Sequence, residues 1–114
     1  MLRFDEQAHG HTVEADRGQE VEIHLQENPT TGFRWQVMQT GSPVCTLLNE
    51  TLDPGHKAPG QAGVHSWNFK IVALGTASIE LVYRRSWDAT AAAGRTFTLY
   101  LSCKKPRATK SGTP

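Results

Sequence analysis

The chain has 114 residues, of which 38% are hydrophobic and 20% charged, with a formal net charge of +1. This composition excludes a disordered chain and predicts one globular domain with its own hydrophobic core. A charge balance so near neutral also argues against nucleic acid or a membrane surface as the partner.

The sequence contains no segment suited to membrane insertion. Its apolar runs are all shorter than the roughly 18 to 20 residues of a transmembrane helix. The N-terminus has no apolar core and carries Asp5 and Glu6, unlike a signal peptide. We therefore expect a soluble protein that remains in the cytoplasm, unless the chain is a processed form.

Alternation of apolar and polar residues predicts β-strands along most of the chain. Segments with one apolar face are, in chain order, residues 21–25, 33–37, 67–73, 77–83 and 97–103, with shorter candidates at 11–14 and 44–48. Each pattern is typical of a strand with one face on a core and the other toward water. The helical period has no match beyond a short alanine-rich run near residue 90.

Gly, Pro, Asn and Asp gather at the breaks between these segments and indicate turns. About seven short strands with such breaks predict an all-β, immunoglobulin-like antiparallel β-sandwich. We expect one domain over residues 1–103 and a flexible basic tail over residues 104–114. Because no aromatic residue interleaves the charges of the tail, it does not predict nucleic-acid binding.

Three connections are unusual for a domain of this size. Residues 26–32 form a compact polar turn, residues 49–63 a long loop, and residues 84–94 join two strands that a tight hairpin could have linked. Connections of that length are more often functional than idle. Alternate connections of a sandwich emerge at the same end, so we expect the three to cluster there if they follow alternate strands.

The first connection contains the motif Asn28-Pro29-Thr30-Thr31-Gly32, followed by Phe33. Pro29 fixes one φ angle, and Gly32 permits a positive φ that a β-branched residue would resist. Asn28 can bond to backbone amides two residues on. The motif therefore predicts a stiff turn that holds two threonines outward, although on composition alone an ordinary strand connector would be the favoured interpretation.

This run resembles the signature of the chagasin family of cysteine peptidase inhibitors. Two further segments resemble the family in the same order, namely residues 60–64 ahead of Trp67-Asn68-Phe69, and residues 81–87, which end in Arg85-Ser86-Trp87. Each segment alone is a weak signal, whereas three in order over residues 21–101 are specific.

The resemblance implies an immunoglobulin-like sandwich that reversibly inhibits papain-like cysteine peptidases by placing three loops in the active-site cleft. It implies neither a cofactor nor a metal. The implied peptidase contacts are Asn28, Pro29, Thr30, Thr31, Gly32, Phe33, Gly60, Gln61, Ala62, Gly63, Val64, Arg84, Arg85, Ser86 and Trp87. Thr31 would lie beside the catalytic cysteine of the target, and Arg85 and Trp87 on the primed side. Ser86 replaces the family's usual proline, and Gln61-Ala62 stands where a further glycine is usual.

Two other interpretations remain open at this point. An immunoglobulin-like adhesion or assembly module could use the same loops for a non-peptidase partner, because one sandwich fold hosts many functions. A hydrolase could use Cys45 or Cys103 with a distant histidine. Cys103 falls on an apolar strand face, where a thiol is inert, and two buried free thiols are common at this cysteine count. We therefore expect a monomeric inhibitor rather than an enzyme.

The remaining aromatic and imidazole side chains divide between core and surface. Trp35 and Trp67 fall on apolar faces and are predicted core residues. Trp87 is predicted to be an interface anchor, with a core position at a strand end as the alternative. No metal ligand set is indicated by spacing, and we expect all the histidines at the surface. These are His9, His11, His24, His56 and His65.

Overall fold

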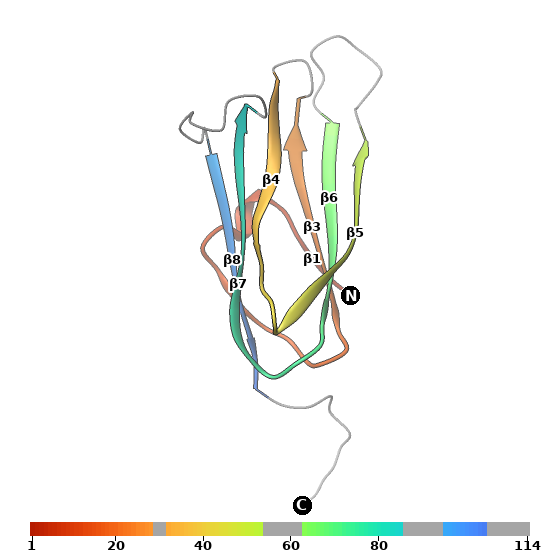
Figure 1. The fold of residues 1–114 in the computed structure, drawn as a ribbon, viewed down its shortest axis with the longest axis vertical. Helices are drawn as coiled ribbons and strands as arrows, with labels where there is room; N and C mark the ends of the chain where they lie inside the picture. Colours follow the sequence, from red (N-terminus) through yellow and green to blue (C-terminus); the bar gives the residue numbers. More distant parts are fainter. Residues whose placement is uncertain (29–31, 54–62, 86–94, 105–114) are drawn as a thin grey trace, which may run out of the picture.

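The structure is a computed structural model that describes residues 1–28, 32–53, 63–85 and 95–104. Within these ranges the chain forms eight β-strands and one short 3-10 helix (Figure 1). In chain order they are β1 (Leu2–Phe4), η1 (Glu6–Ala8), β2 (Thr12–Glu14), β3 (Glu20–Glu27), β4 (Phe33–Thr40), β5 (Cys45–Asp53), β6 (Gly63–Ile71), β7 (Gly75–Arg85) and β8 (Arg95–Cys103).

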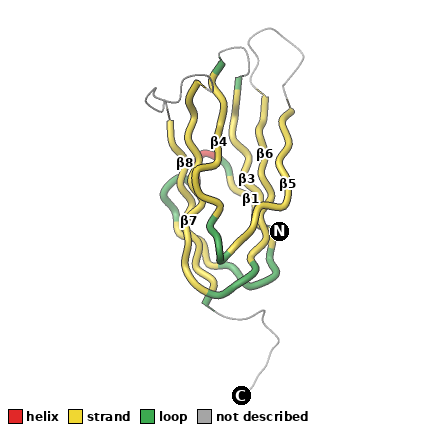
Figure 2. Tube along the Cα trace, viewed as in Figure 1, coloured by secondary structure: helices red, strands yellow, loops and turns green. Residues whose placement is uncertain are grey.

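The strands form two four-stranded sheets that pack face to face. Sheet A has the order β1-β3-β6-β5, and sheet B has the order β2-β8-β7-β4. The predicted β-sandwich is confirmed, with two refinements. The strands number eight within the described ranges, and the pairs β1–β3 and β2–β8 are parallel, so both sheets are mixed. The 3-10 helix lies between β1 and β2, where the chain passes from one sheet to the other (Figure 2).

The apolar faces predicted from the period of two meet between the sheets. The fully buried apolar side chains of the central strands are Val21, Ile23, Leu25, Trp67, Phe69, Ile71, Ile79, Leu81, Leu99 and Leu101. Trp35 and Trp67 lie in this core as predicted. Burial of a large apolar side chain contributes about 1.5–3 kcal/mol each, so this layer is the main source of stability.

Cys45 and Cys103 are buried free thiols, as expected. Burial raises the pKa of the Cys45 thiol to about 11, and its Sγ donates to the carbonyl oxygen of Thr40 at 2.9 Å. A thiol with so high a pKa is almost entirely protonated at neutral pH and is a poor nucleophile. This environment does not suit the nucleophile of a hydrolase.

β5 is longer than predicted and corrects one expectation. Residues 49–53, assigned above to a long loop, continue the strand to Asp53 and pair with β6. The register shifts between Leu47 and Asn49, and a similar shift interrupts β4 between Val37 and Gln39. A bulge breaks the alternation of apolar and polar residues, so the polar residues beyond it resemble a loop in the sequence. Both bulges lie on edge strands, where they discourage pairing with other chains.

The outer face of sheet A carries a chain of polar contacts that joins β1 to β3 and β6. Glu22 bonds the His24 ring at 2.9 Å and pairs with Arg3 at 3.0 Å. The other ring nitrogen of His24 lies 2.8 Å from the Ser66 hydroxyl. The hydrogen bond from His24, with the charges of His24 and Arg3, lowers the pKa of Glu22. The carboxylate therefore stays ionised to a lower pH than a free glutamate and adds a side-chain contact to the backbone pairing of β1 with β3.

The turn between β4 and β5 depends on a glycine that a larger residue cannot replace. Gly41 has a φ of +84°, and an added Cβ would lie 2.5 Å from the Cys45 Sγ. Gly10 has nearly the same φ, +82°, but a Cβ there would meet nothing within 4 Å. The two positions separate backbone strain from steric overlap.

We predict that Gly41→Ala destabilises the fold more than Gly10→Ala. Both variants incur the strain of a positive φ, about 1–2 kcal/mol, while overpacking at Cys45 adds about 1–3 kcal/mol to Gly41→Ala alone. Urea unfolding of the two variants and the parent measures the difference. Equal losses would show that the buried thiol moves aside without cost.

Candidate functional site

The end of β3, β5 and β7 and the start of β4, β6 and β8 lie at one end of the sandwich, which we call the loop end (Figure 1). Glu27, which ends β3, pairs with Gly63, which begins β6, and Asp53 at the end of β5 pairs with Val64. In sheet B, Phe33 at the start of β4 pairs with Arg85 at the end of β7. The three connections that carry the motifs follow β3, β5 and β7. These are alternate strands, which is the condition under which we expected the connections to emerge at the same end.

The structure describes part of the predicted contact set. Asn28, Gly32, Phe33, Gly63, Val64, Arg84 and Arg85 lie at the loop end, at or beside the described strand termini. Gly32 has a φ of +79°, which confirms the predicted left-handed turn position. Pro29, Thr30, Thr31, Gly60, Gln61, Ala62, Ser86 and Trp87 lie outside the described residues.

On sheet B the loop end is built from aromatic rings in tilted contact, with two guanidinium groups over them. The Tyr83 ring lies 5.4 Å from the Phe33 ring and 4.9 Å from the Trp35 ring, measured between centroids. The Arg85 guanidinium lies over Phe33 at 5.4 Å, and that of Arg95 over Trp35 at 5.7 Å. Cation–π contacts contribute about 0.5–1 kcal/mol each at exposed sites. These contacts join the described ends of β4, β7 and β8 to one another.

A buried carboxylate joins the two sheets at the same end. Glu27 is 1% exposed. Its Oε1 accepts from the backbone N–H of Trp35 at 2.8 Å and lies 2.9 Å from Nδ1 of His65, and its Oε2 accepts from Nε of Arg34 at 3.0 Å. The indole N–H of Trp35 donates in turn to the carbonyl oxygen of Gln26 at 2.9 Å. Strand β3 of sheet A is thereby bonded to β4 of sheet B on both sides of the first motif.

His65 extends this network to a third strand and corrects the expectation of a surface histidine. It is 4% exposed, and its ring stacks on the Trp67 ring at 4.0 Å. Its Nε2 lies 2.6 Å from Oε2 of Glu50 on β5. His65 occupies the position two residues before Trp67 on the buried face of β6, and Glu27 the position two residues after Leu25 on the buried face of β3. If the alternation of buried and exposed residues is continued to the ends of β3 and β6, it places both Glu27 and His65 on the buried faces.

The chemistry of the described site is that of a scaffold. Glu27 and His65 form a carboxylate–imidazole pair, but both ring nitrogens face carboxylates. Within the described ranges, no group of three or more His, Cys, Asp or Glu side chains could hold a metal ion. Among those same residues, no helix is long and apolar enough to cross a membrane. The contacts that are present hold strands in place.

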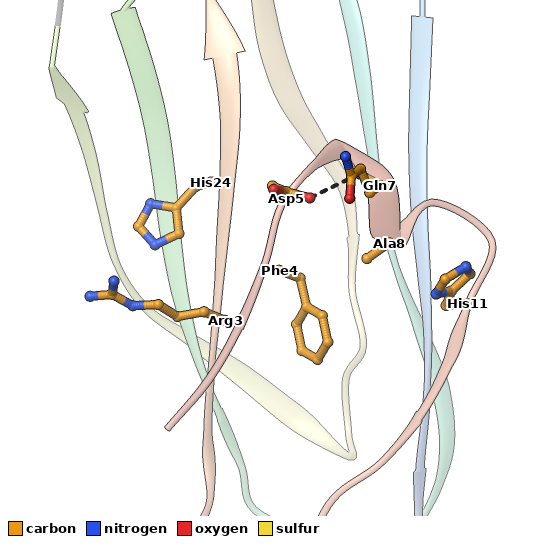
Figure 3. Close-up of a pocket in the computed structure, with 7 residues that line it drawn as sticks. All are labelled: Arg3, Phe4, Asp5, Gln7, Ala8, His11 and His24. Carbon is orange, nitrogen blue, oxygen red and sulfur yellow. Dashed lines mark hydrogen bonds between the residues drawn. The ribbon is translucent and has the colours of Figure 1, made fainter.

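A hollow of about 500 Å³ lies away from the loop end, beside β1 and η1 (Figure 3). Arg3 and His24 lie on one side of it and His11 on the other. Its charged groups are already engaged, because Arg3 and His24 both contact Glu22, and Asp5 accepts from the backbone N–H of Gln7 at 3.0 Å. The hollow is open to solvent, and the charges of Arg3, His24 and Asp5 beside it are held by these contacts.

Residues 14–101 match the model of the chagasin family peptidase inhibitors, I42. Chagasin from Trypanosoma cruzi is 33% identical over 97 residues, which cover 81% of this chain and 88% of chagasin. Amoebiasin-1 from Entamoeba histolytica is 39% identical over 93 residues, which cover 77% of this chain and 85% of that protein.

Two solved structures share the fold. Amebosin superposes with a TM-score of 0.73 at 29% identity, covering 91% of this chain and 99% of amebosin. The cysteine protease inhibitor EhICP2 from Entamoeba histolytica gives a TM-score of 0.76, covering 90% of this chain and 94% of that one. At 22% identity the second likeness concerns the fold alone.

The Tyr83 hydroxyl provides a test of how the first motif is held. It accepts a hydrogen bond of 3.3 Å from the backbone N–H of Asn28. We predict that Tyr83→Phe lowers the free energy of unfolding by about 0.5–1.5 kcal/mol and speeds hydrogen exchange at the Asn28 amide. Tyr100→Phe is the matched control, because Tyr100 is exposed on β8. Similar exchange rates at Asn28 in both variants would contradict a positioning role for Tyr83.

Proposed function

Since this chain belongs to the chagasin family of peptidase inhibitors and not to a family of enzymes, we propose that it reversibly inhibits papain-like cysteine peptidases. The three motif segments at the loop end enter the active-site cleft together and exclude substrate. The inhibitor contributes surface and hydrogen bonds, and no bond is made or broken in its own chain. The match of residues 14–101 to the chagasin family of peptidase inhibitors supports this proposal.

The observation that carries the proposal is the gathering of the strand ends that bracket all three motifs. In sequence these motifs are separated by tens of residues, yet Asn28, Val64 and Arg85 stand at the same end of one rigid sandwich. A papain-like cleft is open at both ends, so a row of three short segments matches its shape. The buried network around Glu27 keeps the segments' bases in place before binding, which reduces the entropy lost on association.

Each segment has a role that its residue types can perform. Thr31 presents a small hydroxyl beside the thiolate–imidazolium pair of the target without burying a charge. Residues 60–64 carry glycines that let the main chain approach the cleft wall and pair with it. Arg85 and Trp87 anchor the primed side, since Trp and Arg dominate interface hot spots. Phe33 supports Arg85 from beneath through their cation–π contact.

Titration of papain with the purified protein tests the proposal. We expect a stoichiometric loss of activity at concentrations above the dissociation constant, competition with substrate, and recovery of activity after dilution. An absence of effect at micromolar excess would instead favour an immunoglobulin-like module for a non-peptidase partner. Slow turnover of the protein by papain would identify a substrate rather than an inhibitor.

We predict that Thr31→Arg abolishes inhibition while leaving the melting temperature nearly unchanged. A bulky charge at the centre of the contact must be desolvated opposite the catalytic pair, whereas a surface substitution changes stability by about 0.5 kcal/mol or less. Thr12→Arg is the matched control, because Thr12 is exposed on β2, which pairs with the distant half of β8. A large loss of stability in Thr31→Arg would make Thr31 part of the framework instead of the contact.

We also predict that Ser86→Pro tightens inhibition. Proline restricts the free loop before Trp87, and a compatible proline reduces the conformational entropy to be lost by about 0.4–1 kcal/mol, which corresponds to about two- to fivefold in the inhibition constant. Trp87→Ala serves as the opposing control and should weaken binding by about 2 kcal/mol or more. Inhibition constants measured on papain test this prediction. Unchanged or weaker inhibition by Ser86→Pro would show that the conformational entropy of the loop before Trp87 does not limit affinity.

A further inference from the structure

We propose that Glu27 and His65 are positioning residues of the inhibitory site, and that a proton shared through the His65 ring makes its geometry depend on pH. The inference rests on the proposed function, because the site that it regulates is the peptidase contact. It concerns residues that the three motifs do not include, apart from their immediate neighbours Asn28 and Val64.

The first step is where the two side chains stand in the chain. Glu27 directly precedes Asn28, the first residue of the first motif, and His65 directly follows Val64, the last residue of the second. The two residues are 38 positions apart in sequence, but Oε1 of Glu27 and Nδ1 of His65 are 2.9 Å apart. Their contact therefore adds a side-chain bond between the bases of the two segments, beside the backbone pairing of Glu27 with Gly63.

The second step is the number of strands that meet there. Glu27 belongs to β3 and also accepts from Trp35 N–H and from Arg34, both on β4. His65 belongs to β6 and contacts Glu50 on β5 at 2.6 Å. One carboxylate and one ring thus connect four strand ends from both sheets. A shift of either side chain moves the bases of two segments at once.

The third step is the proton count. A neutral imidazole has one N–H and can donate to one acceptor, whereas an imidazolium donates from both nitrogens. His65 has a carboxylate oxygen at hydrogen-bond distance from each nitrogen. With His65 protonated, the charges of Glu27, Glu50, Arg34 and His65 sum to zero. With a neutral ring they sum to −1, beside a carboxylate that is almost fully buried, which is costly.

The charged groups around the ring come from three strands. Glu27 faces Nδ1 from β3 and Glu50 faces Nε2 from β5, while Arg34 of β4 lies beyond Glu27. Asp53 also belongs to β5, but it is paired with the residue before His65, so alternation directs it to the opposite face of the sheet. The stacked partner on β6 itself is the uncharged Trp67 ring.

The direction of the pH effect follows from the exposure of the two carboxylates. When the ring loses its second proton as pH rises, one of the two hydrogen bonds must be lost. The Glu50 side chain is 48% exposed and can turn to water, whereas Glu27 is sealed in the core. The neutral ring therefore keeps its bond to Glu27 and releases the Glu50 side chain, which removes the side-chain link between β5 and β6 while their backbone pairing up to Asp53 remains. We expect tighter inhibition in acid than at alkaline pH.

A matched pair of substitutions separates the two bonds. The side-chain amide of His65→Asn places its nitrogen about where Nδ1 stands and keeps a donor for Glu27, whereas that of His65→Gln reaches about where Nε2 stands and keeps a donor for Glu50. We expect His65→Gln to weaken papain inhibition at least tenfold, and His65→Asn to weaken it less and to abolish the pH dependence. His24→Asn, on the outer face of sheet A, is the control with unchanged inhibition.

The inhibition constants are compared as variant-to-parent ratios at each pH, so that the titration of papain itself cancels. If both His65 variants lose inhibition equally and in proportion to their loss of stability, the network contributes only to stability, and the proposal is overturned. If the His65 variants unfold, Glu50→Gln tests the same contact between Glu50 and His65 from the other side. It should flatten the pH profile of inhibition, and an unchanged profile would also overturn the proposal.

A measurement without peptidase distinguishes failure of this inference from failure of the proposed function. Nitrogen-15 NMR of the His65 ring should show two protonated nitrogens in mild acid. A ring with one protonated nitrogen under those conditions would overturn the proton bridge even if papain is inhibited. Two protonated nitrogens in a protein that leaves papain fully active would contradict the proposed function and leave the bridge intact.

Discussion

The carboxylate of Glu27 is buried where β3 ends and accepts hydrogen bonds from groups of both sheets. Taking a carboxylate out of water costs several kcal/mol, and the Arg34 guanidinium, the Trp35 amide and the His65 ring offset that cost. An apolar residue of similar volume could be as stable, but it would leave the Trp35 amide, the Arg34 guanidinium and the His65 ring without this shared acceptor. Glu27 therefore specifies a geometry, and the rest of the loop end depends on that geometry.

The core and the two ends of the sandwich therefore differ in what they contribute to stability and to geometry. The layer between the sheets supplies the free energy of folding through its fully buried side chains. The far end is closed by the Gly41 turn packed on Cys45, which leaves no space for a side chain. The loop end instead carries charges and aromatic rings above the core, and these fix directions more than they add stability. A preorganised end of this kind is what a reversible inhibitor requires, since loop ordering would otherwise subtract from affinity.

The same framework also suits a protein that binds a peptidase without being cleaved or cross-linked by it. The thiols are buried, and the pKa of Cys45 is raised to about 11, so neither exchange nor nucleophilic attack is favoured there. Bulges interrupt both β4 and β5, the edge strands nearest to the first two motif segments. Edge strands that cannot extend an intermolecular sheet leave the connecting segments as the surface for association.

The sequence by itself determined the class of fold, the seven longer or clearer strands, the two core tryptophans, the positive φ of Gly32 and the order of the family motifs. All of these are local signals, because a side-chain period of two or a turn glycine is fixed by neighbours in the chain. The tertiary structure alone decided the parallel pairing of the three-residue strands β1 and β2, because a local pattern does not say which strand a segment will pair with. It decided that Asn49 to Asp53 form a strand, since the bulge before them reverses the alternation. It also decided the bridge from Glu27 through His65 to Glu50, whose members are 38 and 15 residues apart and meet because the pairing of β3, β6 and β5 brings their ends together.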